Sequence, residues 1–160
     1  MSLQHQILKD GIAHGMCDKF RDTWGEPTIE DLCDKYFRGQ DFCIEHDWPS
    51  LEFLDANLKG QTSPFGIFIN ESGKVTNNRY VALLGNSIVT MESNVSSDVT
   101  IRHNSTLFLR AKKNTFVYVS IHDDAELVVV SREPGARIYC SHFGGKINDL
   151  GLIDKYYKKF

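Results

Sequence analysis

Several features that often reveal function are scarce or missing in this sequence of 160 residues. Its apolar runs are far shorter than the roughly 18 residues of a membrane-spanning helix, so we expect no membrane association. The first residues lack the basic-then-apolar order of a secretory signal. The four cysteines show no close-packed disulfide framework, and three lie at apolar helical positions where a free thiol packs as a small apolar group. We therefore expect a cytoplasmic protein.

Motifs of common enzymes are also missing. The sequence contains neither a Gly-x-Ser-x-Gly nucleophile elbow nor a Gly-x-x-x-x-Gly-Lys phosphate loop. The tight carboxylate group of Asp123, Asp124 and Glu126 is explained by a solvent-exposed turn. No basic stripe interleaved with aromatic residues is present, so we expect no nucleic-acid binding. The sequence favours a non-enzymatic protein.

Charge is distributed unevenly along the chain. Residues 1–60 hold 6 Lys/Arg and 12 Asp/Glu, whereas residues 61–160 hold 12 Lys/Arg and 9 Asp/Glu. Such asymmetry favours ordered association, either between the two regions or between copies of the chain.

The most prominent feature is a strand-sized pattern that recurs six times between Ser87 and Cys140. In each unit a small residue is followed two and four positions later by apolar residues. The small residues are Ser87, Ser97, Ser105, Thr115, Ala125 and Ala136. The apolar pairs are Val89 and Met91, Val99 and Ile101, Leu107 and Leu109, Val117 and Val119, Leu127 and Val129, and Ile138 and Cys140. Because alternate residues of a strand face the same side, each unit buries both members of its pair.

The constant phase of this pattern favours a β-solenoid, because equivalent positions of successive coils lie above one another. The alternative is an antiparallel β-barrel or jelly roll with a helical N-terminal extension. We predict an α+β protein whose solenoid has about three coils of two strands. The expected divisions are a helical lobe (1–60), a junction with a short strand and turn (61–78), the repeats (79–147) and a C-terminal cap helix or tail (148–160).

The N-terminal region shows helical periodicity. An i, i+4 apolar row predicts an amphipathic helix over residues 4–22. Thr28 is placed to cap a second helix that ends at Gly39, and Asp47 or Ser50 to cap a third that ends at Gly60.

Large apolar and aromatic side chains fall at outward positions of the predicted strands. Together they form more apolar surface than a protein leaves in water as one patch. We predict that they are covered by the helical lobe, by a second copy or by another protein partner. The predicted partner-binding residues are Phe108, Phe116, Tyr118, Val128 and Tyr139. The leading hypothesis is therefore that the protein self-assembles or binds a protein partner. The change Tyr118→Glu tests it, since this change should either unfold the protein or dissociate the oligomer.

Two other functions remain open. His103, His122 and His142 follow alternate strands, so with two units per coil they would share one column of turns and could bind a divalent transition metal. This alternative is a metal-binding module or a small metal-dependent enzyme; otherwise we expect no cofactor. The weaker alternative is carbohydrate binding, with Phe116, Tyr118 and Tyr139 stacking on sugar rings.

The repeat block, about residues 79–147, resembles the short β-solenoid proteins of bacteria and their prophages, many of unknown function. The resemblance lies in the pattern of the repeats. It implies a solenoid fold and a bacterial or prophage origin, and it assigns no activity.

Overall fold

The computed structural model describes residues 1–158, which form five α-helices, one 3-10 helix and eleven β-strands. The helices are α1 (Leu3–Ala13), α2 (Asp18–Asp22), α3 (Ile29–Arg38), α4 (Gln40–His46), α5 (Leu51–Leu58) and η1 (Ser63–Phe65). The first strands are β1 (Ile67–Ile69), β2 (Ser72–Val75), β3 (Tyr80–Leu84), β4 (Ile88–Ser93), β5 (Ser97–Ile101) and β6 (Thr106–Ala111). The remaining strands are β7 (Phe116–Ile121), β8 (Glu126–Arg132), β9 (Arg137–His142), β10 (Lys146–Asn148) and β11 (Lys155–Lys158).

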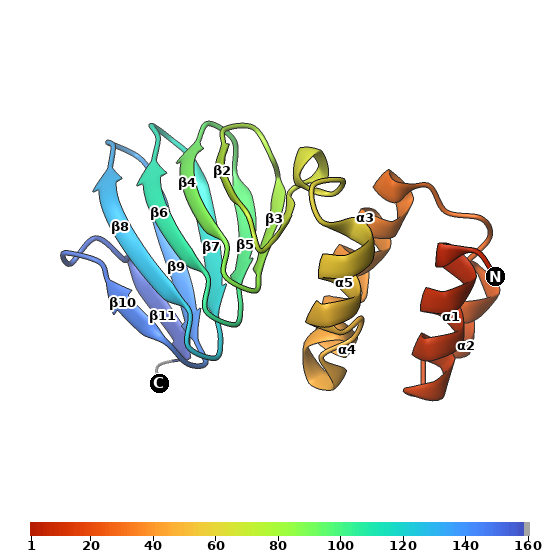
Figure 1. Ribbon diagram of the computed structural model, residues 1–160. Helices are drawn as coiled ribbons and strands as arrows, with labels where there is room; N and C mark the ends of the chain where they lie inside the picture. Colours follow the sequence, from red (N-terminus) through yellow and green to blue (C-terminus); the bar gives the residue numbers. More distant parts are fainter. Residues whose placement is uncertain (159–160) are drawn as a thin grey trace.

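The strands wind into a β-solenoid with two strands per coil (Figure 1). Odd-numbered strands form one sheet in the order β1-β3-β5-β7-β9-β11, which we call sheet A. Even-numbered strands form the second sheet in the order β10-β8-β6-β4-β2, which we call sheet B. The pairings are parallel throughout the described strands, which confirms the solenoid and excludes the antiparallel barrel.

The predicted coil number is wrong: the solenoid has about five coils instead of three. Strands β1 and β2 supply the first coil, within the segment expected as a junction. Strands β10 and β11 extend the other end. These four strands and β3 lack the small residue and apolar pair of the six central units, so the repeat pattern did not reveal them.

The solenoid interior is formed by the predicted apolar pairs. All twelve of these residues are completely buried, and they belong to one apolar cluster that fills the space between the sheets. The six small residues are buried as well, at the corners where the chain turns from one sheet to the other. At one corner Ser105 Oγ donates to the carbonyl of Gly85 in the preceding coil at 2.9 Å. Small side chains therefore let successive corners approach closely.

The N-terminal lobe contains more helices than expected. The predicted helix over residues 4–22 is divided by Gly15, whose φ of +92° interrupts the helical backbone between α1 and α2. Thr28 and Asp31 form a capping box at the start of α3, and Ser50 caps α5. The segment between these helices, to which the sequence analysis assigned no helix, forms α4.

The helical lobe packs against one end of the solenoid, beside its first coils (Figure 1). Its apolar core is separate from the solenoid interior and includes outward-facing side chains of β1 and β3. These strand residues are Ile67, Ile69, Ala82 and Leu84. Alternate residues of β1 and β3 therefore belong to different apolar cores, one on each face of sheet A.

The C-terminal segment forms strand β11, so the cap helix that we offered as one possibility for this segment does not form. Leu152 and Ile153 pack against the interior cluster and help to close the last coil. Among residues 1–158, no helix combines the length and the apolarity needed to cross a lipid bilayer.

Candidate functional site

An aromatic cluster lies on the outer face of sheet A, on the strands farthest from the helical lobe. Phe116 and Tyr118 come from β7, Tyr139 from β9 and Tyr157 from β11. The ring centroids of Phe116 and Tyr139 are 4.8 Å apart, and those of Tyr139 and Tyr157 are 5.7 Å apart. Tyr118 lies 6.0 Å from Tyr157. We call these four residues the aromatic face.

The aromatic face combines exposed rings with positive charge. Phe116 is 39% exposed and Tyr157 is 57% exposed, so both rings of the cluster are accessible to a partner. The Lys155 ammonium lies 4.7 Å from the Tyr157 ring centroid, and the exposed Lys158 shares the same strand. Arg137, also exposed, pairs in register with Phe116. The face therefore offers aromatic contact area with Lys155 beside it, while Arg137 pairs with Asp154 at 3.6 Å and Lys158 lies 4.9 Å from the Phe143 ring centroid.

The five predicted partner-binding residues divide between the two sheets. Phe116, Tyr118 and Tyr139 belong to the aromatic face, whereas Phe108 and Val128 are register partners on the outer face of sheet B. Tyr157 was missed because the segment around it was expected to be a cap helix or a tail. The signal that could have found it is the run Lys-Tyr-Tyr-Lys over residues 155–158, because tyrosine favours β-strands.

The helical lobe covers the beginning of sheet A and stops short of the aromatic face. Phe37 of α3 contacts Tyr80 of β3, with ring centroids 5.6 Å apart. One strand further, Gln40 donates a hydrogen bond to Thr100 of β5. Thr100 belongs to a neighbouring outward row, whereas the row of Tyr80 continues through Asp98 to Tyr118 and Tyr139. This row of outward residues is thus covered at one end and accessible at the other.

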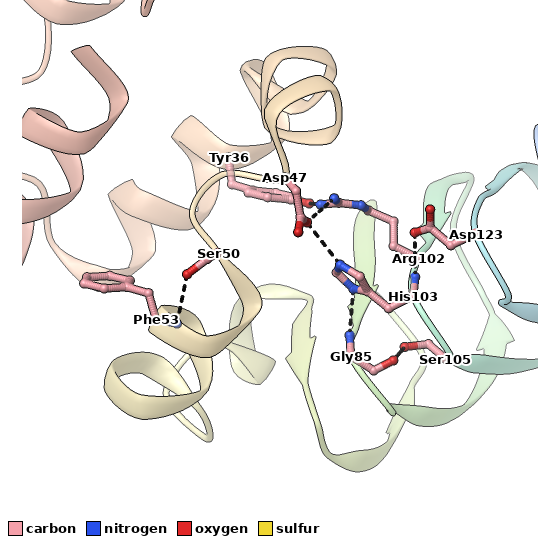
Figure 2. Close-up of polar contacts among 9 residues, drawn as sticks. All are labelled: Tyr36, Asp47, Ser50, Phe53, Gly85, Arg102, His103, Ser105 and Asp123. Atoms are coloured by element: carbon pink, nitrogen blue, oxygen red, sulfur yellow. Dashed lines mark hydrogen bonds and ion pairs between the residues drawn. The ribbon is translucent and has the colours of Figure 1, made fainter. Parts of the chain in front are cut away.

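A polar cluster joins the helical lobe to the solenoid (Figure 2). Arg102, which follows β5, has a side chain only 5% exposed. Its Nη1 donates to the Tyr36 hydroxyl at 3.1 Å and its Nη2 to Asp47 Oδ1 at 2.8 Å. His103 Nε2 lies 3.2 Å from the same carboxylate oxygen. The cluster anchors α3 and the end of α4 to the third coil.

Burial and charge shift the pKa values in this polar cluster. Burial raises the pKa of the Tyr36 phenol to about 12, so it remains a hydrogen-bonding hydroxyl at neutral pH. Burial alone would lower the pKa of the Arg102 guanidinium, but Tyr36, Asp47 and Asp123 raise it above its ordinary value. Neither group is prepared for proton transfer near pH 7, which indicates a structural contact.

The three predicted metal-binding histidines do not share one position in the coil. Ile101 pairs with Ile121, an offset of twenty, but His103 and His122 are nineteen residues apart. His142 pairs in register with Ile121. Each ring therefore faces a different environment, because the spacing between successive histidines is one residue shorter than the coil that separates them.

The histidines have partners of their own. Gly85 N–H donates to His103 Nδ1 at 2.9 Å, so the Nε2 of that ring carries the proton. The ring of His122 stacks on Phe143 at 4.7 Å, and His142 Nε2 lies 2.9 Å from the Gly145 carbonyl. Within residues 1–158, no three His, Cys, Asp or Glu side chains are arranged to hold a metal ion. The metal alternative gains no support from this geometry.

Taken together, the fold and these sites define a short two-sheet β-solenoid with a helical lobe at one end and an aromatic face on sheet A. Comparisons with family models, with curated proteins and with solved structures found no match. The bacterial or prophage origin implied by the resemblance therefore stays an expectation.

Proposed function

We propose that this protein is a non-enzymatic assembly protein that associates with further copies of itself through the aromatic face. The observation that carries the proposal is the exposure of Phe116 and Tyr157 within a contiguous cluster of four aromatic rings. Aromatic side chains supply much of the binding energy in protein interfaces at low cost in conformational entropy.

Charge complementarity favours the acidic helical lobe of a second copy as the occupant. Arg137, Lys155 and Lys158 lie on the strands β9 and β11 that carry part of the aromatic face, whereas residues 1–60 carry 12 acidic and 6 basic side chains. Contact between two aromatic faces would bring these cations together. Contact between the face and an acidic lobe joins two different surfaces, so it generates a ring or an open chain of subunits. Assembly within a cytoplasmic compartment, where the four free cysteines stay reduced, is part of the proposal.

The test is multi-angle light scattering over a range of protein concentration and salt. We expect wild-type protein to form species larger than the monomer, and their mass to fall as salt screens the charges. Phe116→Glu places an acidic group where the partner is acidic. This change should weaken association by at least about tenfold, since hot-spot aromatic residues contribute about 2 kcal/mol or more.

The matched control is Phe108→Glu, the same substitution on the outer face of sheet B. It should leave the mass distribution unchanged, and circular dichroism should show both variants folded. A monomeric wild-type protein at every concentration, or equal dissociation by both variants, would overturn the proposal.

A further inference from the structure

The helical lobe contains a cavity of about 380 Å³. Its walls come from α1 to α5 and from the outward face of β1 and β3, so it lies within the apolar core of the lobe. Leu32, Leu54 and Leu58 line it from the helices, and Ile69 and Leu84 line it from sheet A. Protein interiors are close-packed and contain few voids larger than a water molecule. A cavity of this volume is therefore a candidate binding site, since small-molecule sites occupy roughly 300–1,000 Å³.

The hydroxyl groups of the cavity wall already have partners within the chain. Thr62 Oγ1 donates to the Ile67 carbonyl at 2.8 Å. The Tyr36 hydroxyl accepts from Arg102 Nη1 at 3.1 Å. Both hydroxyls therefore contribute to holding the wall together, and a ligand need not satisfy them.

The other heteroatoms of the buried wall add little polarity. Trp24 and Trp48 contribute their rings, but both indole Nε1 atoms are themselves buried and do not reach the cavity surface. Burial raises the pKa of the Cys33 and Cys43 thiols to about 12, so both are uncharged at neutral pH. The interior wall formed by these side chains therefore favours an occupant without charge.

The charged side chains at the cavity carry both signs. Lys35 and Arg38 line it together with Asp41. The Lys35 ammonium lies 5.3 Å from the Trp24 ring centroid, and Arg38 Nε pairs with Asp34 Oδ2 at 3.0 Å. Because positive and negative groups are mixed here, they select neither an anion nor a cation.

We propose that this cavity binds a small uncharged hydrophobic molecule, of the size of an alkylbenzene, between the helices and sheet A. Removal of apolar surface from water drives such binding, and an apolar cavity of about 150 Å³ in another protein is already sufficient to bind benzene. The site is independent of the aromatic face, because its residues belong to the helical lobe and the first coils.

Butylbenzene is the probe, and phenylbutyrate is its charged counterpart of similar size. Because both tryptophan rings line the cavity, butylbenzene should change their emission in a saturable manner when it is titrated into the full chain. Calorimetry should give one site per chain, and the urea midpoint should rise with the butylbenzene concentration. Phenylbutyrate should bind at least about tenfold more weakly, because its carboxylate would lose hydration in this cavity.

Two substitutions that fill the cavity locate the site. Leu58→Phe in α5 and Leu32→Phe in α3 should each weaken butylbenzene binding at least about tenfold, while cooperative urea unfolding shows that each variant is folded. Ile88→Phe is the matched control, because it adds a ring at a position 52% exposed on the outer face of sheet B. This control should leave the affinity for butylbenzene unchanged.

Absence of saturable butylbenzene binding to the wild-type chain would overturn the proposal. Equal affinity for phenylbutyrate would contradict the uncharged class of ligand, and unchanged binding in the folded filling variants would contradict the site. Phe116→Glu separates this site from the aromatic face. It should leave butylbenzene binding intact, and a loss of binding in this variant would place the ligand on the aromatic face instead.

Discussion

At the scale of single residues, several side chains act at positions where the backbone turns sharply. His103 and Asp123 both have positive φ, at 56° and 55°. Asp123 Oδ2 accepts from the His103 N–H at 2.9 Å, while His103 Nδ1 accepts from Gly85 one coil earlier. These polar turn residues tie successive coils together, as Figure 2 shows for His103. The polar side chains of His103 and Asp123 therefore have a structural role, which is to stabilise these turns.

At the contact between the lobe and the solenoid, Asp47 interacts with two solenoid residues. Its carboxylate receives Arg102 Nη2 and His103, and its φ of 45° is one that asparagine also tolerates. Asp47→Asn should therefore keep the backbone while leaving the buried guanidinium without its anionic partner. We expect a loss of about 1–2 kcal/mol in the free energy of unfolding, because Asp47 itself is 60% exposed and solvent screens part of the interaction.

Urea unfolding followed by circular dichroism measures this loss. Asp18→Asn is the control, because Asp18 pairs with Arg21 on the surface of the same lobe. A change no larger than that of the control would show that the Arg102 contact does not hold the lobe in place.

At the scale of elements, the central strands were predictable because each combines a small residue with an inward apolar pair. The six small residues and the twelve apolar ones are all buried, as the alternation implied. The outer coils were not predictable from that rule. Strand β2 has the sequence Ser-Gly-Lys-Val and presents one buried residue, Val75. Strand β11 follows Leu152 and Ile153, which pack against the interior cluster. The register shift between Tyr156 and Lys158 places Tyr157 outward.

The aromatic face was predictable only in part, for the same reason. Phe116, Tyr118 and Tyr139 lie on strands with the full pattern, so their outward direction followed from alternation. The predicted column of three histidines does not form, because a shift of one residue moves a side chain to a different position in the coil.

The C-terminal strand is held by Asp154, which provides a prediction for the pH dependence of stability. Asp154 Oδ2 accepts from the Ile138 N–H at 2.8 Å, and its carboxylate pairs with Arg132 and Arg137. Burial raises the pKa of this carboxyl, but the Ile138 and Arg132 hydrogen bonds and the two arginine charges outweigh it and lower the pKa overall.

A lowered pKa in the folded state means that this group stabilises the protein above the ordinary aspartate pKa of about 3.9. The stabilisation is lost as the pH falls through the folded-state pKa. Asp154→Asn should therefore reduce stability by about 1–3 kcal/mol at neutral pH, and the difference from wild type should shrink in acid. Urea midpoints measured from neutral to acidic pH test this, with Asp124→Asn in an exposed turn as the control. A difference that is constant across the pH range would contradict it.

At the scale of the whole molecule, the two apolar cores meet at β1 and β3. Leu83 faces the solenoid interior and Leu84 faces the helical lobe, although they are neighbours in the chain. In a solenoid each coil contacts only its neighbours, so disturbance at one end need not reach the other. The lobe, in contrast, rests on the first coils and depends on them for part of its core. Destabilising the solenoid should therefore destabilise the lobe more than destabilising the lobe affects the solenoid.

A matched pair of leucine truncations tests this asymmetry by hydrogen exchange of native protein. Leu84 is 1% exposed and Leu109 is fully buried, so either change to alanine should cost about 2–5 kcal/mol. Leu84→Ala should accelerate exchange in α1 to α5 while β6 to β9 remain protected. Leu109→Ala lies in a central coil and should accelerate exchange in the solenoid and, through β1 and β3, in the lobe as well. Equal acceleration everywhere in both variants would instead indicate one cooperative unit, in which the lobe and the solenoid unfold together.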